Sequence, residues 1–107
     1  MKPTLLLLLA AFLAAPALAD DNAVSLSLKD HAFMPAEIHV KAGVATTVTL
    51  TNDDPETEEF DSASLKIEKI VRGNSTGVMR WRPLAPGRYP FMGERHSDTA
   101  RGVVIAQ

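Results

Sequence analysis

Apolar and polar residues alternate one by one along most of the chain after residue 23, and this period of two limits the fold more than any other feature. In the first run, Val24, Leu26 and Leu28 alternate with polar residues, as on a half-buried strand. Turn residues such as Gly43 and Gly87 separate the runs, and no helical repeat of useful length interrupts them. The sequence therefore predicts an all-β protein, a Greek-key β-sandwich of about seven to eight strands. The alternating runs cover residues 24–28, 38–40, 46–51, 65–71, 79–82, 89–91 and 103–105.

The N-terminal segment has the pattern of a secretory signal peptide. Lys2 provides a positive charge, residues 5–15 are almost wholly aliphatic, and Ala17 and Ala19 form a small-x-small cleavage site. The apolar stretch is shorter than the roughly 20 residues that a transmembrane helix needs, although an uncleaved anchor is the alternative. We therefore expect residues 1–19 to be a signal peptide cleaved near Ala19, and residues 20–107 to be one exported domain in the periplasm.

Composition excludes several classes of protein. The chain has no cysteine, which rules out a disulfide scaffold, a zinc–thiolate finger, an iron–sulfur cluster and a catalytic thiol. A formal net charge of −2 argues against a nucleic-acid binder, which usually carries a strong basic excess. The hydrophobic content of 46% is that of an ordinary folded domain. We interpret its aromatic residues, Trp81 first among them, as core.

An acidic segment stands between two of the predicted strands. Residues 53–61 contain six carboxylates in nine positions, and like charges so close together repel and raise one another's pKa. A bound cation would relieve that repulsion, whereas a solvated acidic loop is the alternative. Phe60 is expected to face the core, so strand alternation places Glu58 on the inward side and Glu59 on the opposite one.

Two further segments carry residues that a bare sandwich does not need. Glu94 and His96 follow the strand around residues 89–91, and alternation would point them to the same side. His31 lies at the end of the first strand, before a bend that contains Pro35. A lone loop histidine is usually a surface residue, and we interpret His39 in that way.

The order of these pieces resembles the cupredoxin family from about Val24 to Ala106. The matching motifs are His-x-Phe-x-Pro-x-x-Ile-x-Val-x-x-Gly over residues 31–43, the Thr-rich strand that ends at Asn52, and Pro-Gly-x-Tyr-x-Phe over residues 86–91 followed by His96. The resemblance implies a Greek-key sandwich with a metal site at one end. It also implies that this site is built from the loop after the strand ending at Asn52 and from the loop that holds His96.

The chain departs from the blue-copper pattern of that family. Gly93 stands where a blue-copper protein has its cysteine, Glu58 or Glu59 occupies the stretch of the first histidine, and no methionine follows His96 in the usual place. Without a thiolate a blue-copper electron carrier is excluded. The remaining carboxylates and imidazoles suit iron or Cu(II) rather than Cu(I).

The candidate metal ligands are His96, Glu94, Glu58, Glu59 and His31. His31 joins the others only if the first strand runs parallel to the third, as it does in cupredoxins. Neutral imidazole is needed for ligation, so we expect metal binding to weaken below about pH 6.

The acidic and C-terminal motifs resemble one subgroup in particular. Residues 58–60, 91–96 and 98–102 are similar to the periplasmic EfeO-type and FtrB-type cupredoxin domains of bacterial iron uptake. That resemblance implies an inner-membrane iron permease as partner and a role in ferrous or ferric iron uptake.

Two other interpretations stay open at this point. A metal-free sandwich could serve as a protein-docking module in the same pathway, since a fold does not by itself imply a function. A ferroxidase would need an electron acceptor, and the sequence shows no second redox centre. A hydrolase is not indicated, because the chain has neither a Gly-x-Ser-x-Gly elbow nor a His-Glu-x-x-His motif.

Overall fold

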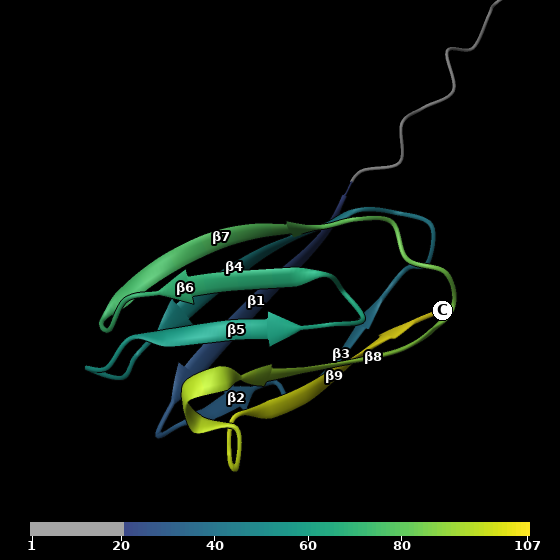
Figure 1. Ribbon diagram of the computed structural model, residues 1–107. Coiled ribbons are helices and arrows are strands. Elements are labelled where there is room, and N and C mark those ends of the chain that lie inside the picture. The colour runs from purple at the N-terminus through teal and green to yellow at the C-terminus, as the bar shows by residue number, and fades with distance from the viewer. Residues whose placement is uncertain (1–20) are drawn as a thin grey trace, which may run out of the picture.

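The computed structural model describes residues 21–107, so the signal peptide predicted for residues 1–19 lies outside the described residues. The described chain forms nine strands and one short 3₁₀ helix, arranged in two packed layers (Figure 1). The elements are β1 (Asn22–Lys29), β2 (Ala32–Met34), β3 (Glu37–Val40), β4 (Thr46–Asn52), β5 (Glu58–Ser62), β6 (Ile67–Val71), β7 (Ser75–Trp81), β8 (Gly87–Gly93), η1 (Glu94–His96) and β9 (Arg101–Ala106).

The strands form a four-stranded sheet of order β2-β1-β4-β7 and a five-stranded sheet of order β3-β9-β8-β5-β6. In the first sheet β1 runs parallel to β4, with Val24 opposite Val48 and Leu28 opposite Asn52. The expected parallel pairing of the first and third predicted strands is therefore confirmed. In the second sheet β3 runs parallel to β9, while β8 is antiparallel to both β9 and β5. The all-β sandwich predicted from the sequence is confirmed.

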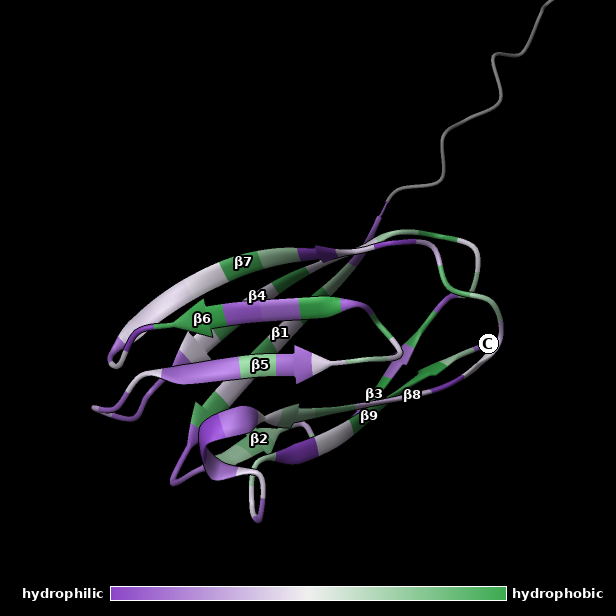
Figure 2. Ribbon diagram, viewed as in Figure 1, coloured by the Kyte–Doolittle hydropathy of each residue, from purple (hydrophilic) through white to green (hydrophobic). Residues whose placement is uncertain are grey.

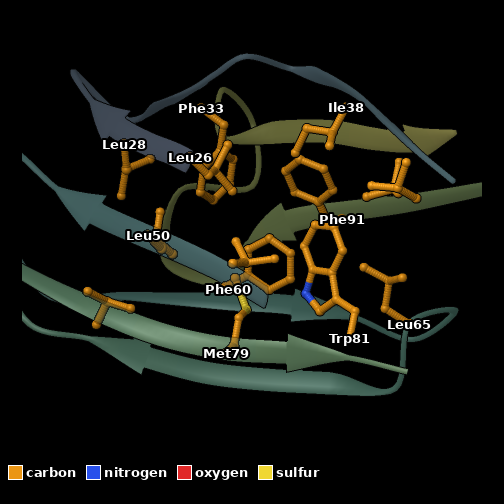
Figure 3. Close-up of a cluster of buried hydrophobic side chains, with 14 of the residues drawn as sticks. Leu26, Leu28, Phe33, Ile38, Leu50, Phe60, Leu65, Met79, Trp81 and Phe91 are labelled. Carbon is orange, nitrogen blue, oxygen red and sulfur yellow. The ribbon is translucent and has the colours of Figure 1, made fainter. Parts of the chain in front are cut away.

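Alternation places one face of each sheet in a shared core (Figure 3). Phe60 lies at its centre, stacked on Phe91 at a centroid distance of 5.0 Å and on Trp81 at 5.9 Å. Phe33 meets Phe60 and Phe91 edge-on. Such aromatic pairs add to the stabilisation from apolar burial. Trp81 is fully buried, which confirms its interpretation as a core residue.

Two of the nine strands are not among the alternating runs in the sequence. β2 has only three residues, too few to display a period. β5 occupies the acidic segment, whose residue types are depleted in strands. Its side chains nevertheless alternate: Glu58 and Phe60 are buried, while Glu59 is only partly buried. The opposite orientations expected for Glu58 and Glu59 are confirmed.

Three connections meet at one end of the sandwich, opposite the C-terminus (Figure 1). These are the turn between β1 and β2, the loop between β4 and β5, and η1 after β8. The parallel pairing of β1 and β4 brings the first two together, and the antiparallel pairing of β5 and β8 brings the third. Hydrophilic residues colour η1 and the neighbouring turn in Figure 2. No helix within residues 21–107 has the length and apolar character needed to cross a membrane.

Candidate metal centre

His31 lies on a two-residue turn with an unusual backbone. Asp30 and His31 connect β1 to β2 with φ values of 51° and 57°, the left-handed conformation that a type I′ hairpin turn requires at both central positions. Residues other than glycine adopt it at a cost, although Asp and His do so more often than most. The carboxylate of Asp54 compensates, because its two oxygens accept the backbone N–H groups of Asp30 at 2.7 Å and His31 at 3.0 Å.

The loop between β4 and β5 is held by a buried amide. Asn52, which ends β4 and is fully buried, donates through Nδ2 to the carbonyl oxygens of Glu56 at 2.8 Å and Val71 at 3.1 Å. Its Oδ1 accepts the backbone N–H of Asp54 at 3.0 Å. One side chain thus pairs three backbone groups, two in the loop and one at the end of β6, as buried polar groups require. This places Glu56 and Asp54 at the same end of the sandwich as His31.

The third element of the site is η1, which follows β8 directly. His96 is the last residue of this single 3₁₀ turn, and its side chain is 24% exposed. Its Nδ1 lies 2.5 Å from Oε2 of Glu58, which is 1% exposed. The carbonyl of His96 accepts the backbone N–H of Ala100 at 2.8 Å. His96 is therefore held both at its backbone carbonyl and at Nδ1 of its ring.

His31, Glu56 and His96 converge into a cluster that we call the His–Glu–His cluster. His31 Nε2 lies 2.6 Å from Glu56 Oε2, and His96 Nε2 lies 3.9 Å from the same oxygen. One potential ligand atom from each residue lies within 4.8 Å of the other two. The imidazole rings stack face to face with centroids 3.6 Å apart. Two imidazoles and one carboxylate form a donor set suited to Cu(II), iron or zinc.

The carboxylate of Glu56 changes the protonation of His31. Its hydrogen bond to the ring raises the pKa of His31 above the ordinary value of 6.5, against a smaller opposing effect of desolvation. A metal ion would have to displace the proton that this interaction stabilises. The raised pKa therefore moves the expected weakening of metal binding to a higher pH than the sequence alone suggested.

Three of the five residues predicted as ligands lie together, and two lie apart. His31, His96 and Glu58 meet as described, with Glu58 touching His96. Glu59 faces away from the core, and the neighbouring carboxyl group of Glu94 is the largest cause of its raised pKa. Glu94 does not share a side with His96, as alternation predicted, because residues 94–96 form a 3₁₀ turn. Residues two apart in such a turn point in different directions.

Glu59 on β5 and Glu94 on η1 form a carboxyl pair outside the core. The contact with Glu94 raises the pKa of Glu59, and desolvation and the nearby charges of Glu94, Glu68 and Asp61 raise it further. Within residues 21–107 neither carboxylate belongs to the His–Glu–His cluster.

Three residues at this end of the sandwich are not among those predicted from the sequence. The sequence alone does not distinguish Glu56 within the acidic segment, and it indicates no positioning role for Asn52 and Asp54. The available signal was Asn52 at the end of a β-branched strand followed by Asp54, since short polar side chains often cap backbone groups in turns.

Steric packing at Gly93 also bears on the type of site. A Cβ added there would lie 2.7 Å from Cδ of Glu58 and 2.8 Å from Cβ of Ala100. Gly93 is the position of the cysteine in the blue-copper pattern. The carboxylate of Glu58 thus fills the space next to the backbone from which a thiolate would have to extend.

The chain matches a known domain family over almost its whole length. The sequence model that describes the cupredoxin-like domain matches residues 3–106. The chain belongs to the cupredoxin-like domain family. A protein of Rickettsia prowazekii, itself uncharacterized, is 37% identical over 82 residues, which are 77% of this chain and 66% of that protein. This cupredoxin-like chain thus spans about two thirds of the length of that relative.

Solved structures share the fold at low sequence identity. Auracyanin A, a blue copper protein from Chloroflexus aurantiacus, superposes with a TM-score of 0.70 at 14% identity, over 82% of this chain and all of that one. The metal-binding domain of the Cu(I)-exporting ATPase CopA of Streptococcus pneumoniae also gives 0.70, at 17% identity over 79% and 84%. Amicyanin from Paracoccus versutus gives 0.62 at 21% identity over 88% of each chain. These likenesses establish the cupredoxin-like sandwich.

Replacing Asp54 with alanine should loosen the turn that carries His31. Burial by itself would raise the pKa of Asp54, but the N–H donors of His31 and Asp30 outweigh it and lower the pKa. The change leaves two N–H groups without their acceptor in a left-handed turn. We expect it to lower the free energy of unfolding by about 1–3 kcal/mol, measured by denaturant titration near neutral pH.

The matched control is Asp53→Ala, one residue earlier and exposed, which should change stability by less than about 0.5 kcal/mol. Because the folded-state pKa of Asp54 is lowered, its stabilising effect should be present above its ordinary pKa of 3.8 and disappear as the pH falls below it. Equal stability of the two variants near neutral pH would contradict this role.

Replacing Glu56 with glutamine should lower the pKa of His31 toward its ordinary value of 6.5, since the hydrogen-bonded carboxylate is the largest cause of the raised pKa. An NMR titration of the imidazole resonances measures this directly. The sign of the linked stability is also determined: the ion pair stabilises the fold below pH 6.5 and loses this effect as the pH rises through the raised pKa. Glu37→Gln, on β3, is the control and should leave the His31 titration unchanged. An unaltered His31 pKa in Glu56→Gln would refute the assignment.

Proposed function

We propose that this protein binds a transition-metal ion, Cu(II) or iron, through His31, Glu56 and His96. The single observation that carries the proposal is the convergence of one donor atom from each residue within 4.8 Å, from three separate elements of the fold. Two imidazoles and a carboxylate match the ligand preferences of these ions better than those of Cu(I). The chain has no cysteine, so a blue-copper centre is not proposed.

The stacking of the two imidazole rings limits how one metal ion could bind to both of them. A nitrogen lone pair lies in the plane of its ring, and these planes are only 15° from parallel at a centroid separation of 3.6 Å. Both rings cannot aim their Nε2 atoms at one ion at a bond length near the value of about 2.0–2.1 Å known for zinc and histidine. One ring must turn. We expect His31 to be the ring that turns, because its side chain is the more exposed, 39% against 24% for His96. Within residues 21–107 its ring also has no contact with a buried carboxylate like the one between His96 and Glu58.

The proposed biological role is iron acquisition in the periplasm, beside an inner-membrane iron permease. The support for it is the resemblance of residues 58–60, 91–96 and 98–102 to the cupredoxin domains of bacterial iron uptake, together with the signal-peptide pattern of residues 1–19. In this role iron is the cargo, and Glu56 would offset part of its charge. The imidazole nitrogens would supply neutral donors that exchange with protons as the pH changes.

A metal-free docking module is the second candidate, and one observation favours it. His31 and Glu56 already form an ion pair at 2.6 Å, so part of the cluster is satisfied by its own partner. This alternative predicts that the cluster residues can be replaced without any change in metal behaviour.

The proposal predicts saturable binding of one ion and its loss on removing either histidine of the cluster. The purified protein would be titrated anaerobically with Fe(II), and separately with Cu(II), by calorimetry near pH 7.5. His31→Ala and His96→Ala should each weaken binding at least tenfold. His39→Ala is the matched control: this third histidine lies on β3, beside Glu37 at 3.4 Å, and outside the cluster. Its replacement should leave the affinity unchanged.

Two results would contradict the metal-binding proposal. No heat with either ion would favour the docking module. Binding that survives the loss of both His31 and His96 would place the ion elsewhere on the chain. Comparing the two titrations identifies which ion the protein prefers, and admitting air to the Fe(II) sample then tests whether the bound iron is oxidised.

A further inference from the structure

We propose that Glu58 is a positioning residue that holds His96 in the tautomer with its proton on Nδ1, so that Nε2 is the metal-binding nitrogen. This inference rests on the proposed function and deepens it, because it assigns the buried carboxylate a role through His96 rather than as a ligand. The observations that carry it are the hydrogen-bond partners of Glu58, its burial, and its packing against Gly93.

Within residues 21–107, every polar partner of the Glu58 carboxylate is a donor or can be one. Oε1 accepts the backbone N–H groups of Arg95 at 2.8 Å and Glu59 at 3.0 Å. Oε2 lies 2.5 Å from Nδ1 of His96. A carboxylate only accepts hydrogen bonds, and a neutral imidazole carries its proton on one nitrogen. The contact with Oε2 therefore requires the proton of His96 on Nδ1, which leaves the lone pair on Nε2.

The orientation of the ring agrees with this assignment. With Nδ1 directed at the buried carboxylate, Nε2 lies 3.9 Å from Oε2 of Glu56 and faces the rest of the His–Glu–His cluster. A histidine that ligates a metal through one nitrogen commonly donates its other N–H to a carboxylate, which fixes the ring and increases its basicity.

Packing keeps the Glu58 carboxylate in place. The residue is 1% exposed, and its Cδ lies where a side chain on residue 93 would begin, 2.7 Å from an added Cβ. Its backbone is fixed by the ladder between β5 and β6, where Glu58 lies opposite Val71. Oε1 is already occupied by two backbone donors. The carboxylate consequently has little freedom to leave His96 and reach an ion beside Glu56.

Glu58→Gln tests the proposal with almost no change in volume. The amide oxygen can still accept the N–H groups of Arg95 and Glu59, so its NH₂ group must face His96. An NH₂ group only donates. His96 Nδ1 must then accept, and the ring proton moves to Nε2, where it blocks coordination. Glu37→Gln makes the same chemical change on β3, outside the cluster, and serves as the control.

The experiment has two readouts. Long-range ¹H–¹⁵N correlation spectra of the histidine-labelled protein without metal, at about pH 8 where free imidazole is neutral, report which nitrogen of His96 carries the proton. Calorimetric titration with Cu(II) reports affinity. We expect Nδ1–H in the original protein and Nε2–H in Glu58→Gln, with Cu(II) affinity reduced by about 10–100-fold. Glu37→Gln should match the original protein in both.

The outcomes separate this inference from the proposed function. An Nε2–H tautomer in the original protein overturns the inference, and this measurement needs no variant to fold. A Glu58→Gln protein that switches tautomer yet binds Cu(II) unchanged also overturns it. If the original protein binds neither Cu(II) nor Fe(II), the metal-binding proposal fails, whereas the tautomer of His96 measured without metal still decides whether Glu58 holds the proton on Nδ1. An Nδ1–H tautomer together with the loss of affinity supports both.

Discussion

The parallel pairing of β1 with β4 is the constraint on which the candidate metal centre depends. Parallel strands end at the same edge of a sheet, so the turn after β1 and the loop after β4 emerge side by side. Asp54 then joins the two, because its carboxylate accepts both N–H groups of the Asp30–His31 turn. These two hydrogen bonds stabilise the left-handed turn. They also hold His31 where its ring contacts Glu56.

On the other side of the site, a buried carboxylate takes the place of a thiolate. Glu58 extends inward from β5 into the space beside Gly93. Its carboxylate contacts Nδ1 of His96. Burying a charge is unfavourable unless it is paired and hydrogen-bonded, and three donors surround this one. Auracyanin A, a blue copper protein, has a similar fold. In this chain the corresponding sandwich carries imidazole and carboxylate groups at one end.

The sequence was informative where a period or a motif had one structural meaning. Alternation predicted the sandwich and the opposite orientations of Glu58 and Glu59, and the resemblance to cupredoxins supplied the parallel pairing of the first and third predicted strands. Alternation was misleading at Glu94, because a strand pattern was extended into a 3₁₀ turn that only the three-dimensional structure reveals. The sequence did not distinguish Glu56 from its acidic neighbours. Which of these carboxylates reaches the histidines depends on the loop conformation that the hydrogen bonds of Asn52 hold.

The position of the ion itself tests this account most directly. Crystals grown with Cu(II) and measured on both sides of the copper absorption edge would locate the metal without assumptions about its ligands. The account predicts one anomalous peak bonded to Nε2 of His96, with His31 and Glu56 as its other protein ligands and Glu58 still bonded to Nδ1. A peak on the Glu59–Glu94 pair, or none within reach of the two histidines, would contradict it.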